Sequence, residues 1–125
     1  GWIKNKILHN SRYEVRNDIN NAVIFLDNHD MTRISVDCNF NVDKIKNLLK
    51  LMFTFNHNDI CIYYGTEIGM GVPNGYVHCG GHGDFHSRTK MDWHEVERQR
   101  KDENSIFNYI KKLIHEYKSK EELMI

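Results

Sequence analysis

Two apolar runs separated by a helical pattern dominate the first half of the chain. Residues 22–26 and 60–64 are short, continuously apolar and rich in strand formers, so each predicts a buried strand. Between them, residues 42–55 carry apolar side chains at helical spacing with lysines opposite, and Asn41 is a candidate N-cap. Strand, helix and strand in this order predict a βαβ unit with parallel strands and a right-handed crossover.

The second half has a different pattern. Residues 65–103 are glycine-rich and largely without periodicity, which predicts a long irregular loop. A loop of that length in a compact domain is usually functional. A last helix is expected from about Ser105, with apolar residues up to Tyr117 on one face and residues 118–122 as its solvated end. Residues 1–20 suggest only a short helix and a loop.

Composition and charge narrow the class of protein. With 125 residues, 40% of them hydrophobic and 27% charged, the chain resembles an ordinary globular domain. Lys+Arg and Asp+Glu both number 17, which argues against a nucleic-acid platform and a polybasic membrane anchor. No apolar run approaches the roughly 20 residues of a membrane span. We find no signal peptide, and the three cysteines are an odd number, so we expect a cytoplasmic protein, although the chain does not begin with Met.

A polar cluster, Asp27-Asn28-His29-Asp30, ends the first predicted strand. Functional side chains of parallel α/β folds lie at the carboxyl ends of strands. A carboxylate there can stabilise a developing oxocarbenium ion, and a histidine can donate a hydrogen bond to a sugar hydroxyl. Since Asn and Asp also favour turns, a plain turn is an equally good interpretation of the spacing alone.

Three ordered motifs change that balance. Residues 25–33 (FLDNHDMTR) resemble the FxxNHDxxR motif of glycoside hydrolase family 13, the α-amylase family. Residues 62–70 (IYYGTEIGM) are similar to that family's eighth barrel strand and the loop after it. Residues 84–93 (DFHSRTKMDW) are similar to its D-x-x-x-R-x-P-M-x-W segment, with Lys90 where the family usually has Pro. Residues 104–117 are similar to the eighth barrel helix.

The resemblance implies roles for individual residues. Asp30 would be the catalytic carboxylate that stabilises the transition state, and His29 would bind ring hydroxyls beside the scissile bond. Asn28 would position these two. Asp84 and Arg88 match a pair that recognises the sugar's non-reducing end in some exo-acting members. The implied substrate is an α-linked oligosaccharide or glucan, processed with retention by hydrolysis or transfer.

The resemblance also implies an incomplete fold. A (β/α)8 TIM barrel needs about 250 residues, and neither the nucleophile motif nor the acid/base motif of the family is found here. The expected fold class is therefore α/β, with residues 1–125 forming a partial catalytic barrel domain that holds the last two parallel strands and helices. The rest of the barrel is expected upstream. An unpaired sheet edge should leave the isolated chain marginally stable. Without the nucleophile and acid/base motifs, the isolated chain should also be inactive.

Several alternatives remain open at this level. The chain could be a non-catalytic, carbohydrate-binding relative of the family. Glu67 could be an acid/base group, although a structural role is favoured. Trp93 is expected to pack. A histidine-rich stretch could bind zinc, but a polar loop is the favoured interpretation, so no metal or cofactor is assigned. The residues of that stretch are His78, Cys79, His82, Asp84 and His86.

Overall fold

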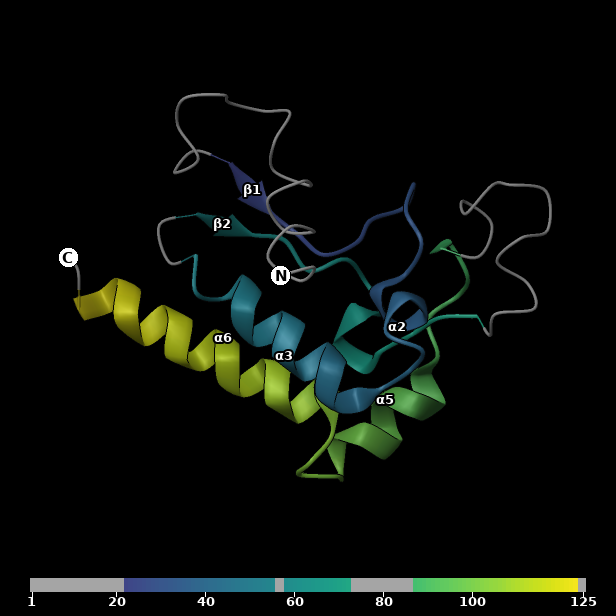
Figure 1. Ribbon diagram of the computed structural model, residues 1–125. Coiled ribbons are helices and arrows are strands. Elements are labelled where there is room, and N and C mark those ends of the chain that lie inside the picture. The colour runs from purple at the N-terminus through teal and green to yellow at the C-terminus, as the bar shows by residue number, and fades with distance from the viewer. Residues whose placement is uncertain (1–21, 56–57, 73–86, 124–125) are drawn as a thin grey trace.

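The computed structural model describes residues 22–55, 58–72 and 87–123. In chain order its elements are β1 (Val23–Ile24), α2 (Ile34–Asp37), α3 (Val42–Met52), β2 (Asp59–Ile60), the 3-10 helix η2 (Thr66–Ile68), α5 (Trp93–Arg100) and α6 (Ile106–Leu123). The two strands lie side by side on one side of a helical layer (Figure 1). In that layer α3 and α6 run alongside each other, and α5 packs against the start of α6.

The strands pair in parallel, as the βαβ pattern predicted. Val23 lies opposite Asp59 and Ile24 opposite Ile60. Both strands are shorter than the apolar runs that predicted them, although the Cys61 amide still donates to the Ile24 carbonyl at 2.8 Å. Leu26 remains buried beyond the end of β1. Burial in the first run therefore continues past the point where the backbones stop pairing. The prediction that the second run, residues 60–64, is buried is wrong: Cys61 and Tyr64 are exposed and the other three residues are half-buried, because β2 borders an open groove.

The helix α3 forms the centre of the core. It begins at Asn41, whose Oδ1 accepts a hydrogen bond from the Lys44 amide at 3.0 Å, so the predicted N-cap is confirmed. The helix ends at Met52, three residues before the predicted end, because Phe53 already caps it. Its apolar face is fully buried between the strands and α6. That face consists of Ile45, Leu48, Leu49 and Met52.

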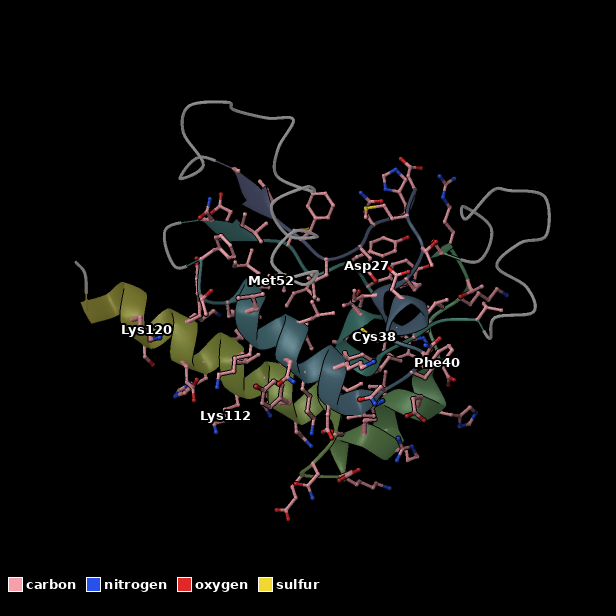
Figure 2. All side chains as sticks on the ribbon, viewed as in Figure 1. Asp27, Cys38, Phe40, Met52, Lys112 and Lys120 are labelled. Carbon is pink, nitrogen blue, oxygen red and sulfur yellow. The ribbon has the colours of Figure 1, made fainter. Side chains whose placement is uncertain are left out.

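The final helix, α6, is confirmed, and its end at Leu123 agrees with the expectation that residues 118–122 form its last part. Its buried residues pack on α3, while Lys112 and Lys120 project from the outer side (Figure 2). Near its far end, the Tyr117 hydroxyl donates to the Asn58 carbonyl at 2.7 Å. The Asn58 side chain in turn donates to the Ala22 carbonyl at 2.8 Å. These two bonds tie α6 to the starts of both strands.

The prediction of an irregular loop over residues 65–103 is wrong at both ends of that segment. Gly65 adopts a left-handed φ of 88°, which glycine tolerates, and leads directly into η2. The pattern of apolar residues did not predict the helix α5, because its two buried residues are Val96, which is apolar, and Gln99, which carries an amide. Gln99 replaces apolar packing with hydrogen bonds: its Nε2 donates to the Ile68 carbonyl at 2.8 Å, and its Oε1 accepts from the Phe107 amide at 3.1 Å.

The expectation that Trp93 packs is also wrong. It is the first residue of α5 and is 69% exposed, because the buried face of that helix lies further along, at Val96 and Gln99. The single turn α2 was not predicted, since four residues are too few to show a periodicity. Residues 1–20 and the central part of the loop, 73–86, lie outside the described residues. Within the part of the chain that is described, no helix is both long and apolar enough to cross a membrane.

Candidate functional site

The polar cluster after β1 is a turn that displays two polar side chains. The Met31 amide donates to the Asn28 carbonyl at 3.3 Å, and the Asn28 Oδ1 accepts from the Asp30 amide at 2.9 Å. His29 and Asp30 point into solvent, with side chains 59% and 62% exposed. The plain turn and the candidate site are thus the same feature. Asn28 has the positioning geometry expected of it, because it fixes the backbone of Asp30.

A second segment brings an arginine to this turn. Arg88 Nη2 donates to Asp30 Oδ1 at 2.9 Å, and Arg88 Nε donates to the His29 carbonyl at 3.2 Å. His29 Nε2 lies 3.2 Å from Asp30 Oδ2. Three of the four predicted site residues therefore meet, and the fourth, Asp84, lies outside the described residues. Exposed ion pairs of this kind add only about 0–1 kcal/mol to stability, so the cluster presents charge and hydrogen-bonding groups at the surface.

A buried carboxylate lies beneath the exposed one. Asp27 is 2% exposed, and its two oxygens accept from the Ile34 amide at 2.9 Å and the Thr66 hydroxyl at 2.7 Å. It lies on the inner side of the strand end, close to α2 (Figure 2). Asp27 thereby fastens the turn to α2 and η2. The two acidic residues of the sequence cluster therefore have opposite environments: Asp27 is buried and Asp30 is exposed.

The most buried cation of the site was missed by the sequence analysis. Arg33 is 2% exposed and donates from Nη1 to the Tyr64 carbonyl at 2.5 Å and from Nη2 to the Ser87 carbonyl at 3.1 Å. Its guanidinium lies 4.5 Å and 4.8 Å from the ring centres of Tyr63 and Tyr64. The available signal was its place as the last residue of the FxxNHDxxR motif. Ser87, which also donates from its hydroxyl to the Met31 carbonyl, offered no signal.

The two tyrosines close the site from the side of β2. Their rings meet edge to face, 4.7 Å between centres. The Tyr63 hydroxyl donates to the Ser87 carbonyl at 3.1 Å, and the Tyr64 hydroxyl donates to the Thr89 carbonyl at 2.5 Å. Both hydroxyls are therefore engaged by the segment that carries Arg88.

Comparison with known proteins identifies the family. The model of the family described as alpha amylase, catalytic domain, matches residues 2–94. The chain belongs to the α-amylase family. The intracellular maltogenic amylase of Bacillus subtilis is 36% identical over 96 residues, which are 75% of this chain and 14% of that protein. A cyclomaltodextrinase of Geobacillus thermopakistaniensis is 34% identical over 93 residues, 74% of this chain and 13% of that protein. No solved structure matches the chain.

Each of these relatives is much longer than the chain. The chain spans about one seventh of the length of the curated relatives it matches, in keeping with the 14% of the Bacillus subtilis protein that is aligned. The α-amylase family match covers the three motifs recognised in the sequence and ends at residue 94. The helix α6, whose sequence is similar to the eighth barrel helix of the family, lies beyond the end of this match.

Glu67, the other candidate acid of this α-amylase segment, has a different environment from the exposed Asp30. It is half-buried on η2 and faces a groove whose lining includes Ile62, Phe107 and Lys111. Among the described residues its buried Oε2 has no hydrogen-bond partner. The described part of the chain contains no cluster of three or more potential metal ligands. The proposed zinc ligands His78, Cys79, His82 and His86 all lie outside the described residues.

The site should make the chain sensitive to alkaline pH. Burial, and next the neighbouring Tyr64, raise the pKa of Tyr63 above its usual 10.0, against opposing effects of Arg33 and Arg88. The folded state thus keeps the phenol proton longer than the unfolded state does. The free energy of unfolding is therefore unaffected by the ionisation of Tyr63 below pH 10, and it falls as the pH rises through the higher folded-state pKa of this residue.

The test is urea unfolding of the chain at pH 8 and at a series of values above 10. Tyr63→Phe, which has no ionisable group, should show a shallower loss of stability with rising pH than the unsubstituted chain. Tyr109→Phe is the matched control on α6 and should reproduce the unsubstituted slope. Equal slopes for all three proteins would contradict the assignment to Tyr63.

Proposed function

We propose that this chain is part of an enzyme that hydrolyses, or transfers at, α-glucosidic bonds with retention of configuration. The observation that carries the proposal is the meeting of Asp30, His29 and Arg88 at the carboxyl ends of two parallel strands. Active sites of α/β barrels lie at that end of the strands. Membership of the α-amylase family supplies the substrate class, an α-linked oligosaccharide or glucan.

Each residue has a role suited to its surroundings. Asp30 is an exposed carboxylate that can face a sugar ring and stabilise positive charge as the glycosidic bond breaks. His29, next to it, can donate a hydrogen bond to a ring hydroxyl. Arg88, together with Asp84, would bind the non-reducing end of the sugar. Retaining glycosidases also need a nucleophile and an acid/base about 5 Å apart, and we propose that these come from the remainder of the barrel.

The barrel itself belongs to the proposal: β1 and β2 would be strands seven and eight, and α6 the final helix. The Cys61 amide points toward β1, so the main-chain groups of Ile60, one position earlier, face the other way. On the helical side of β2 runs an apolar groove of about 490 Å³. It is lined by Phe53, Asp59, Ile60, Ile62, Ile114, Tyr117 and Lys118.

A second groove, of about 410 Å³, continues the first between β2, η2 and α6. The two share Ile62 and Ile114. Glu67, whose Oε2 has no hydrogen-bond partner among the described residues, lines this second groove. In the part of the chain that the structure describes, β2 has no second strand partner, the apolar surface is continuous and Glu67 Oε2 has no hydrogen-bond partner. All three features favour a fold that continues with another strand and helix.

The test compares the activity of the isolated chain with that of the same residues in a complete barrel. A chimera carries the aligned residues of this chain in place of the matching 96-residue segment of the Bacillus subtilis relative. The isolated chain should melt at low temperature and release no reducing sugar from soluble starch, because it lacks a nucleophile and an acid/base. The chimera should hydrolyse starch. The intact relative is the control for the assay.

Two outcomes would contradict this proposal. Clear turnover by the pure chain would show that its own residues suffice. A chimera that melts cooperatively and binds starch without hydrolysing it would favour the alternative, a non-catalytic carbohydrate-binding member of the family.

A further inference from the structure

We propose that Arg33 is a positioning residue that, through Ser87, holds Arg88 against Asp30 before any sugar binds. The role of Arg88 in sugar recognition rests on the proposed function, whereas the positioning itself is a property of the fold. Arg33 does not touch the exposed cluster. It acts on the backbone from which Arg88 projects.

The contacts of Arg33 join three parts of the chain. It follows the turn that carries Asp30, and its Nη1 bonds to Tyr64, in the extension of β2. Its Nη2 bonds to Ser87, the residue before Arg88. Hydrogen bonds from a charged donor to carbonyl oxygens are stronger than neutral ones. One buried guanidinium therefore fixes the relative positions of the turn, the strand extension and the segment leading to α5.

Ser87 transmits this constraint to Arg88. Its carbonyl accepts from both Arg33 and Tyr63, and its hydroxyl donates to the Met31 carbonyl. Ser87 is 1% exposed. Arg88 thus projects from a fixed, buried anchor, one residue away, toward a turn that is fastened to the same anchor.

The ion pair between Arg88 and Asp30 would not by itself hold the Arg88 side chain in one position. The side chain of Arg88 is 49% exposed and that of Asp30 is 62% exposed. Such a pair is screened by water and must overcome the rotamer entropy of a long side chain. Fixing the backbone on both sides removes much of the remaining freedom, so the pair forms in a defined geometry.

The chemistry of Arg33 is specific to a guanidinium. It reaches two carbonyls in different directions while its flat face packs on the rings of Tyr63 and Tyr64. A lysine ammonium on a flexible stem cannot reproduce this planar arrangement. For core packing alone an apolar side chain would serve as well, since a buried cation carries a desolvation penalty.

Limited trypsin digestion of the 125-residue chain tests the inference without any activity. Arg88 is itself a cleavage site, and Arg100 in α5 serves as an internal reference. In Arg33→Met, cleavage after Arg88 should accelerate about tenfold relative to cleavage after Arg100, because the anchor that restrains the segment is gone. Arg33→Lys should restore only part of the protection.

The matched control is Arg98→Met. Arg98 is an exposed arginine of α5 that pairs with Glu95, so its loss should leave the ratio unchanged. An equal acceleration at both sites in Arg33→Met would show that Arg33 supports only the fold as a whole, and would overturn the proposal. An unchanged ratio would overturn it as well.

Kinetics of the chimera give a second, independent test. Arg33→Met and Arg88→Ala should each raise KM for starch about tenfold, and combining them should change KM no further. Multiplied effects would mean that Arg33 does not act through Arg88. A chimera that melts cooperatively and binds starch without any turnover would refute the proposed function, and the proteolysis ratio would still decide the positioning role.

Discussion

Asp30→Asn should lower kcat of the chimera on starch by about a thousandfold or more and leave its melting temperature nearly unchanged. The amide keeps the size of the side chain but removes the negative charge that would stabilise the oxocarbenium-like transition state. Stability should survive, because the carboxylate is largely exposed and its partners, Arg88 and His29, are exposed too.

The measurement is initial-rate release of reducing sugar alongside a thermal melt of the same preparation. Asp43→Asn, in the first turn of α3 and remote in sequence from both strand ends, is a matched control and should leave kcat unchanged. Near-normal turnover by Asp30→Asn would refute the role given to this carboxylate.

Asp27→Ala should destabilise the protein by about 2–5 kcal/mol. The substitution leaves the Ile34 amide and the Thr66 hydroxyl buried without their acceptor, at about 1–3 kcal/mol each. It also releases α2 and η2 from the strand end. Urea unfolding of the chimera, monitored by circular dichroism, measures the change in the free energy of unfolding.

The matched control is Asp30→Ala, three residues away. It removes an equally acidic side chain from the same turn and should cost less than about 1 kcal/mol, because water replaces its contacts. Equal losses from the two substitutions would contradict the division between a buried structural carboxylate and an exposed functional one.

The sequence predicted best where the periodicity was strong. The pattern of α3, with Asn41 before it and Ile45 to Met52 on one face, encodes both the start of the helix and its buried side. The apolar runs around Ile24 and Ile60 predicted parallel pairing correctly, though not its extent, since burial and ladder length are separate properties. The polar helix α5 gave no comparable signal, because its anchor, Gln99, is held by hydrogen bonds.

The site residues also fall into two groups, those that the sequence motifs identified and those that only the tertiary structure revealed. The linear motif identified the residues that meet at the surface, His29, Asp30 and Arg88, and placed the chain in the α-amylase family, because motif spacing is a property of the sequence. Only the tertiary structure showed that Asp27 is buried whereas Asp30 is exposed, and that the buried Arg33 joins the Tyr64 and Ser87 carbonyls. A residue is buried by, and bonded to, residues from other segments, which lie as far as 59 positions away in the sequence. No local pattern of residues encodes which of the buried groups will bond to one another.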